Sequence, residues 1–182
     1  MKYVLLLAFG LLLHQTGFCQ DIFTAKGATI SFFSSAPLED IEAKTSKAVS
    51  AINIKTKAIY FKVPIASFDF EERLMQQHFN STYLESDKYP DAEFKGNIQE
   101  EVDLSVAGTY NVTVAGTLTL HGVDKPYREK GTITVSGNTL QLNAKFNVKL
   151  ADHKIKIPTI VVKNIAEQVA VTVNATYAVM AK

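Results

Sequence analysis

The stretch Thr139-Leu-Gln-Leu-Asn-Ala-Lys-Phe-Asn-Val-Lys-Leu150 alternates apolar and polar residues without interruption. Successive side chains of a β-strand point to opposite faces, so this period of two predicts a strand with one buried and one solvated face. Residues 169–179 (VAVTVNATYAV) and 109–121 (TYNVTVAGTLTLH) repeat the alternation. Three strands of 11–13 residues exceed the usual five or six. Such length favours a barrel, whose tilted strands run its full height.

Strands with a weaker alternation are predicted along the rest of the chain. They cover residues 23–33, 40–45, 48–55, 57–64, 92–101 and 128–136. Turn residues separate several of them, with hairpins expected at 136–138 and 122–126. Many antiparallel strands with frequent turns indicate an all-β sandwich or closed barrel, and strand length favours an extended antiparallel barrel.

One segment departs from the β pattern. Residues 67–79 (SFDFEERLMQQHF) carry apolar side chains at helical spacing. Asp69 can cap the helix, and Glu72 three residues later completes a capping-box spacing. The sequence therefore predicts one short helix between strands, lying across a barrel mouth.

The first 19 residues have the features of a secretory signal peptide. Lys2 precedes an apolar run of about a dozen residues, and Gly17 and Cys19 occupy the −3 and −1 positions of a cut before Gln20. The run is too short for a bilayer span of ~20 residues. We expect residues 20–182 to form one barrel domain that is periplasmic or secreted. An uncleaved anchor and a lipoprotein with lipid on Cys19 are the alternatives.

Composition excludes several classes of protein. The 182 residues include 19 Lys and Arg and 18 Asp and Glu, and removal of the leader leaves 163 residues with no net charge. A neutral chain argues against a nucleic-acid partner bound through a broad basic field. Cys19 is the single cysteine and lies in the leader, so the sequence predicts a domain without disulfides or thiolate metal ligands.

The histidines do not form a recognisable catalytic or metal motif. His78, His121 and His153 are far apart in the sequence, and no phosphate loop or nucleophile elbow accompanies them. Asp152 and His153 are expected in a solvated loop. We therefore expect no metal, no catalytic residues and no enzyme activity, although a bound isoprenoid or quinone lipid would fit.

Aromatic and apolar residues gather around the predicted helix. Core packing alone explains many of them, but an aromatic-lined barrel mouth is also a natural site for a hydrophobic ligand. His78, His121 and Tyr83 are the candidates to hold a polar headgroup there. The predicted ligand-binding residues are Phe68, Phe70, Leu74, Met75, His78, Phe79, Tyr83, Phe94 and His121.

Three segments resemble the YceI-like family of bacterial periplasmic proteins. They are residues 65–79, residues 83–94 (YLESDKYPDAEF) and residues 116–126 (GTLTLHGVDKP), and the resemblance extends over about residues 22–180. It implies a lipocalin-like barrel with a small helix that binds a polyisoprenoid or similar amphiphile. Residues 149–158 depart from the family's usual late segment, which indicates a divergent branch.

The leading hypothesis is a barrel that binds a long-chain isoprenoid or similar amphiphilic lipid non-covalently, for sequestration or transport in the periplasm. A cell-envelope interaction module with a filled barrel is the main alternative. A lipid-modifying enzyme is a further one, and it would need His78 or His121 beside a carboxylate in the cavity. The sequence leaves the ligand and the oligomeric state open, with a homodimer as one possibility.

Overall fold

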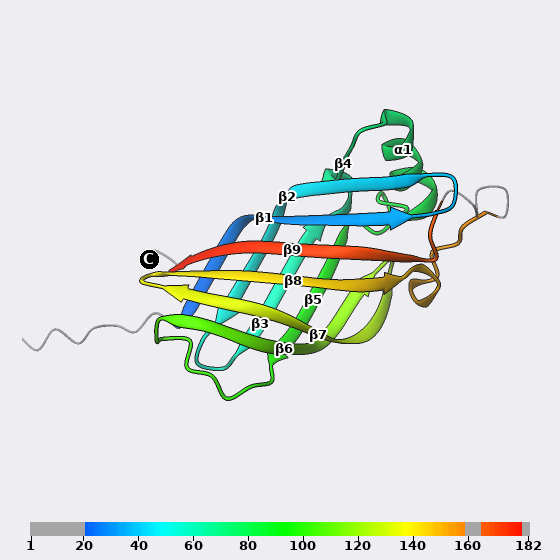
Figure 1. Ribbon diagram of the computed structural model, residues 1–182. Helices are drawn as coiled ribbons and strands as arrows, with labels where there is room; N and C mark the ends of the chain where they lie inside the picture. Colours follow the sequence, from blue (N-terminus) through cyan, green and yellow to red (C-terminus); the bar gives the residue numbers. More distant parts are fainter. Residues whose placement is uncertain (1–20, 159–164, 180–182) are drawn as a thin grey trace, which may run out of the picture.

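The computed structural model describes residues 21–158 and 165–179, so the predicted leader and Cys19 lie outside the described residues. The fold is an antiparallel β-barrel with one short helix, as predicted (Figure 1). The strands are β1 (Ile22–Ser35), β2 (Asp40–Asn53), β3 (Ala58–Pro64), β4 (Asp69–Phe70), β5 (Asp91–Ile98), β6 (Gly108–Leu120), β7 (Val123–Ser136), β8 (Thr139–Lys149) and β9 (Gln168–Val179); the helix is α1 (Arg73–His78).

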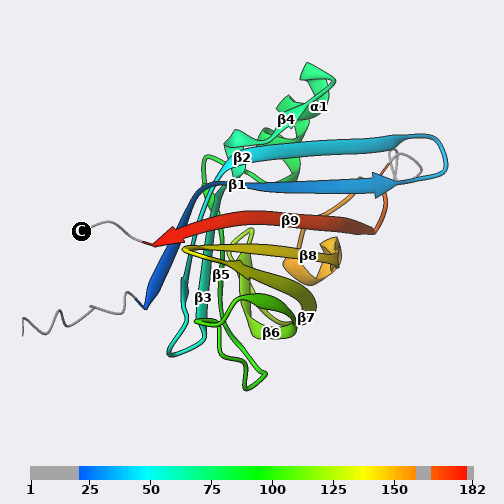
Figure 2. The ribbon, with the colours of Figure 1, turned by 60° about the vertical axis from the view of Figure 1, so that its left-hand side comes forward.

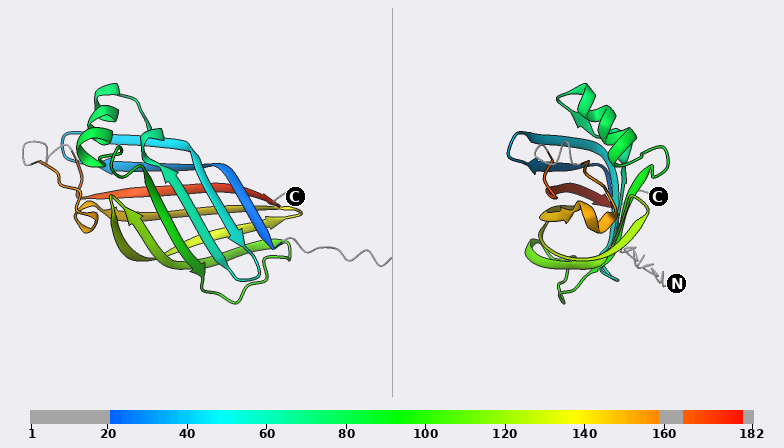
Figure 3. Two further views of the ribbon diagram at one scale, coloured as in Figure 1. Left: turned by 180° about the vertical axis from the view of Figure 1, so that it is seen from behind. Right: turned by 90° about the vertical axis from the view of Figure 1, so that its right-hand side faces the viewer.

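The sheet closes on itself through its first two strands. Its order is β1-β9-β8-β7-β6-β5-β3-β2, and β2 pairs back onto β1 from Ile22↔Asn53 to Ser35↔Asp40. All neighbouring strands are antiparallel. The strands run obliquely around the axis (Figure 3, left), as closure of a twisted sheet requires.

The alternation read from the sequence matches the inner and outer faces of the barrel. On β8, Leu140, Leu142 and Val148 are buried and Ala144 and Phe146 are half-buried, whereas the residues that alternate with them are exposed. On β9, Val169, Val173 and Tyr177 are buried in the same way. The apolar period of two therefore identified the core-facing side of the long strands.

Two of the predicted strands merge into one. Residues 40–45 and 48–55 were expected to be separate, but β2 runs continuously from Asp40 to Asn53. The break in alternation arises because the β1–β2 register shifts twice, around Ala28. Gly27 has a φ of 80° at this irregularity, a conformation that an L side chain rarely adopts.

The predicted helix is shorter than expected, and its predicted cap is wrong. Asp69 forms part of β4, which pairs with β2 at Ala43 and Lys44, so it does not cap α1. Because β3 pairs with β2 only at residues 49–52, the earlier edge of β2 is free to take this short strand. The helix starts after Glu72, which makes no side-chain capping bond, and continues as a π-helical turn, Phe79–Tyr83.

The second predicted hairpin turns earlier than expected. Leu120 pairs with Val123, so the turn is His121-Gly122, with φ values of 52° and 69°. Positive φ at both positions is typical of a two-residue type I′ turn. Pro126, expected within the turn, lies inside β7.

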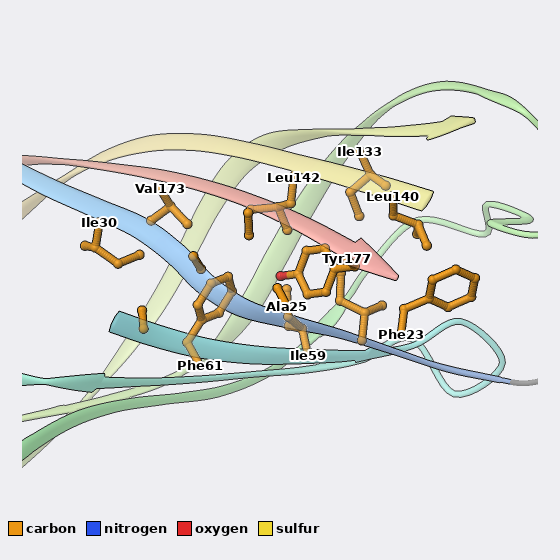
Figure 4. Close-up of a cluster of buried hydrophobic side chains, with 14 of the residues drawn as sticks. Phe23, Ala25, Ile30, Ile59, Phe61, Ile133, Leu140, Leu142, Val173 and Tyr177 are labelled. Atoms are coloured by element: carbon orange, nitrogen blue, oxygen red, sulfur yellow. The ribbon is translucent and has the colours of Figure 1, made fainter. Parts of the chain in front are cut away.

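The barrel is tightly packed at one end. Figure 4 shows Tyr177, Phe23, Leu140 and Ile133 gathered there, with Ile30 and Val173 farther along the interior. Tyr177 is fully buried, and its hydroxyl lies 2.8 Å from Ser50 Oγ, which donates to the Tyr60 carbonyl at 2.6 Å. Burial raises the pKa of the Tyr177 hydroxyl. This end therefore combines apolar packing with a satisfied buried hydroxyl pair.

Replacement of Tyr177 by Phe should lower the free energy of unfolding at pH 7 by about 1 kcal/mol, because Ser50 loses a buried partner. In the wild type the raised pKa makes folding favour the neutral hydroxyl, so stability should fall as the pH rises above the ordinary tyrosine value of 10.0. The free energy of unfolding of Tyr177→Phe should fall less steeply with rising pH than that of the wild type. Urea unfolding at pH 7–11 measures both effects, with Tyr110→Phe as the control at a less buried position. Equal slopes for Tyr177→Phe and the wild type would contradict the assignment.

Candidate functional site

The other end of the barrel encloses an apolar cavity of about 400 Å³. Its walls come mainly from alternate, inward-facing residues of β1, β3, β5, β6, β7, β8 and β9, with one residue from β2. Ile30, Phe61, Val112, Leu142 and Val171 are representative of this lining. The volume is in the range of cavities that hold small molecules.

The segment between β3 and β5 covers this end. The 3-10 turn Ile65–Ser67, strand β4, helix α1 and the π-helical turn follow one another along the rim, beside the β1–β2 hairpin (Figures 1 and 3). A second 3-10 turn, Leu150–His153, follows β8 at the same end. The two segments meet in a small apolar cluster in which Ile65, Leu84, Ala92 and Ile155 are buried.

Four phenylalanines pack the segment between β3 and β5, which includes α1, against the barrel. Phe32 of β1 lies 5.5–5.8 Å, centroid to centroid, from the rings of Phe68, Phe70 and Phe79. Phe70 and Phe79 are 5.0 Å apart, and Phe68 and Phe79 are 5.6 Å apart. Aromatic pairs at these distances contribute beyond the apolar area that they bury. Since all four also line the cavity, the same rings form its roof.

Phe94 reaches the cavity because two glycines leave room for its ring. Gly96 on β5 pairs with Gly116 on β6. A Cβ added to either residue would lie 2.8 Å from the Phe94 Cζ and closer still to backbone atoms of the other strand. The glycine pair therefore sets the position of this aromatic side chain in the wall.

Seven of the nine predicted ligand-binding residues line the cavity. They are Phe68, Phe70, Met75, His78, Phe79, Tyr83 and Phe94. Leu74 does not, because it occupies the outer side of α1 with 61% of its surface exposed. Burial raises the pKa of the Tyr83 hydroxyl. Phe32, Tyr127 and Glu129 also line the cavity and were not among the predicted residues, although the alternation along β1 and β7 is a signal of their inward direction.

His121 does not line the cavity either. Its Nδ1 lies 3.1 Å from the His153 carbonyl oxygen, and its Nε2 lies 2.8 Å from Glu85 Oε2. The ring of Tyr89 packs edge-on against it at 4.6 Å. The imidazole thus connects the β6–β7 turn by polar contacts to the segment before β5 and to the turn after β8.

His153 is fully buried, so its expected place in a solvated loop is wrong. Its Nδ1 donates to the Val123 carbonyl at 3.2 Å, and its Nε2 accepts from the Tyr127 hydroxyl at 3.1 Å. The ring of the half-buried Tyr127 stacks against the imidazole of His153. Burial lowers the pKa of His153 and raises the pKa of the Tyr127 hydroxyl. A local sequence pattern gave no signal of this burial, because the partners come from a strand about 30 residues away.

Within the described residues, no group of three or more His, Cys, Asp or Glu side chains could hold a metal ion. The described chain also contains no helix with the length and apolar character needed to span a membrane.

Lowering the pH from 7 to 5 should reduce the free energy of unfolding, because the depressed pKa means that unfolding takes up a proton at His153. The contribution of His153 is present above its ordinary pKa of 6.5 and is lost as the pH falls below it. His153→Gln should be about 1–3 kcal/mol less stable at pH 7 and should show a weaker pH dependence. Thermal and urea unfolding across this range provide the measurement. His78→Gln, at an exposed histidine, is the control. The assignment would be refuted if the free energy of unfolding of His153→Gln changed with pH as steeply as that of the wild type.

Comparison with known proteins places the fold. The sequence profile described as YceI-like domain matches residues 23–177. A polyisoprenoid-binding domain from Saccharophagus degradans has a similar structure, with a TM-score of 0.74 and 16% identity over 88% of this chain and 99% of that one.

Two further solved structures are similar in fold. BcnA of Burkholderia cenocepacia has a TM-score of 0.69 and 18% identity, covering 82% of this chain and 95% of that one. The YceI protein of Campylobacter jejuni has a TM-score of 0.59 and 18% identity, covering 75% and 81%. No curated protein sequence matched the chain. Because the family profile spans nearly all of the described residues, the chain belongs to the YceI-like domain family.

Proposed function

We propose that this protein binds a long-chain isoprenoid or similar amphiphilic lipid non-covalently inside the barrel. The observation that carries the proposal is the apolar cavity of about 400 Å³ at one end of an otherwise packed interior. Burial of an apolar chain releases about 0.8 kcal/mol per methylene group, so a long chain binds without extensive polar recognition. The polyisoprenoid-binding domain of Saccharophagus degradans, with the same fold, supports this class of ligand.

Transport or sequestration in the periplasm is the role that we propose for such binding. A lipid chain enclosed by the barrel is shielded from water while it moves between membranes. The predicted leader of residues 1–19 supports this location, since it would direct residues 20–182 across the inner membrane. An isoprenoid alcohol and a prenyl quinone both have the long apolar chain that the cavity would accept.

The two alternatives receive less support. A filled barrel would require packed side chains along its whole length, whereas the interior is open between β3, β6 and β8. A lipid-modifying enzyme would require His78 or His121 beside a carboxylate in the cavity. His78 lines the cavity, but among the described residues it has no ion pair with a carboxylate. The His121–Glu85 pair has that chemistry, but neither of its members lines the cavity.

Filling the cavity should weaken binding. Ala144 lines the cavity on β8, so Ala144→Phe places a ring where the lipid chain would lie. We expect at least a tenfold loss of affinity for geranylgeraniol, because excluding even two methylene groups costs about 1.6 kcal/mol. Native mass spectrometry and isothermal titration calorimetry at pH 7 measure stoichiometry and affinity.

The matched control is Lys145→Phe, which adds a similar ring at the neighbouring, outward-facing position of the same strand. It should bind one geranylgeraniol with wild-type affinity. Circular dichroism and thermal unfolding check that both variants fold. Equal binding by Ala144→Phe and the wild type, or no uptake of prenyl lipid by the wild type, would refute the proposal.

A further inference from the structure

Strands β7 and β8 separate partway along the barrel. They pair from Ser136↔Thr139 to Gly131↔Ala144, and no further. The remaining half of β7, residues 123–130, pairs only with β6, and residues 145–149 of β8 pair only with β9. Figures 1 and 2 show the two strands diverging from their hairpin toward the end that carries the cavity.

Pro126 helps to keep this part of the wall open. In an antiparallel ladder, successive residues direct their peptide groups alternately to the two neighbouring strands. Counting from the Leu120–Val123 pair that closes the turn puts the nitrogen of Pro126 on the edge facing β8. Proline has no N–H to donate, which is why it occurs at unpaired strand edges. The sequence of β7 therefore opposes closure of the ladder at this point.

A second, polar hollow of about 460 Å³ occupies the separation. It lies between β7 and β8, next to the 3-10 turn that follows β8. Its lining includes Lys125, Arg128 and Lys149 together with Asp152. Tyr127 and Glu129 line both this hollow and the apolar cavity. The two spaces are thus adjacent across these two side chains, at the place where the barrel wall lacks a ladder.

Glu129 has an unusual environment for a carboxylate. It lies on the inward face of β7, and its neighbour across the β6 ladder is the apolar Val114. Burial raises its pKa. Among the described residues it has neither a hydrogen bond nor an ion pair. A desolvated carboxylate without a partner gains most from a group that donates hydrogen bonds to it.

We propose that the β7–β8 opening is a head-group subsite, in which Glu129 binds a hydrogen-bond-donating head, hydroxyl or ammonium, of an amphiphile whose chain lies in the apolar cavity. This inference rests on the proposed lipid-binding function. Tyr127 lies beside the same passage, with its hydroxyl engaged by His153. The cations Lys125, Arg128 and Lys149 line only the outer hollow. Lys130 also borders the apolar cavity, but it is an exposed residue on the opposite face of β7 from Glu129.

A series of C20 prenyl compounds with one chain and different heads tests the subsite. The series comprises geranylgeranylamine, geranylgeraniol, geranylgeranyl phosphate and the parent hydrocarbon. Competition binding followed by native mass spectrometry at pH 7 ranks them. The wild type should prefer the amine and the alcohol to the hydrocarbon, and it should bind the amine about tenfold or more tightly than the phosphate, since charge-assisted hydrogen bonds are the strong ones.

Glu129→Gln should remove the preference for the amine while retaining binding of the hydrocarbon. Glu101→Gln, at a carboxylate whose side chain is 97% exposed and which does not line either space, is the charge-matched control and should keep the wild-type ranking. The ranking of the four compounds by the wild type tests the head preference even if Glu129→Gln does not fold.

Three results would overturn the subsite. Equal affinity for all four heads would leave lipid binding intact but remove the subsite. Preference for the phosphate, lost in Lys125→Gln or Arg128→Gln, would assign the opening to an anionic head instead. A preference for the amine that persists in Glu129→Gln would place its recognition elsewhere. Failure of every compound to bind would refute the lipid-binding function itself, a distinct outcome.

Discussion

Closure of the sheet by the β1–β2 ladder is the constraint on which the rest of the structure depends. Once β2 pairs with both β1 and β3, the eight long strands surround a fixed interior, and every second residue must point into it. The sizes of the inward side chains then decide where this interior is filled. Tyr177, Leu140 and Ile133 fill one end. Small residues such as Ala144 and Gly131 leave space toward the other.

The cavity end depends on elements that are not part of the barrel ladder. The four-phenylalanine cluster holds the helical segment against β1, while His121 and His153 hold the turns around β7. These contacts join segments that are distant in the sequence. The aromatic roof is therefore positioned by tertiary packing, and its residues serve both the core and the proposed ligand site.

The local pattern predicted much of this arrangement. Alternation in residues 139–150 and 169–179 identified strands, their buried faces and the all-β class, and the clustered aromatics indicated which end would carry the cavity. Two predictions about single residues failed because they depended on partners far away in the sequence. Asp69 pairs with β2 and does not cap a helix, and His153 is buried by β7 and not solvated. Neither partner lies near enough in sequence to influence a local pattern.

A period of two in the amino-acid sequence is sufficient to determine which side of each long strand is apolar, because side-chain direction follows from backbone geometry alone. Whether eight such strands close, and whether the enclosed space is full or hollow, depends on register and on the sizes of residues that meet across the barrel. The glycine pair beneath Phe94, the separation of β7 from β8 and the exposure of Glu129 to the cavity exist only after closure. Tertiary structure alone decided them, since each requires side chains from strands that the sequence places far apart.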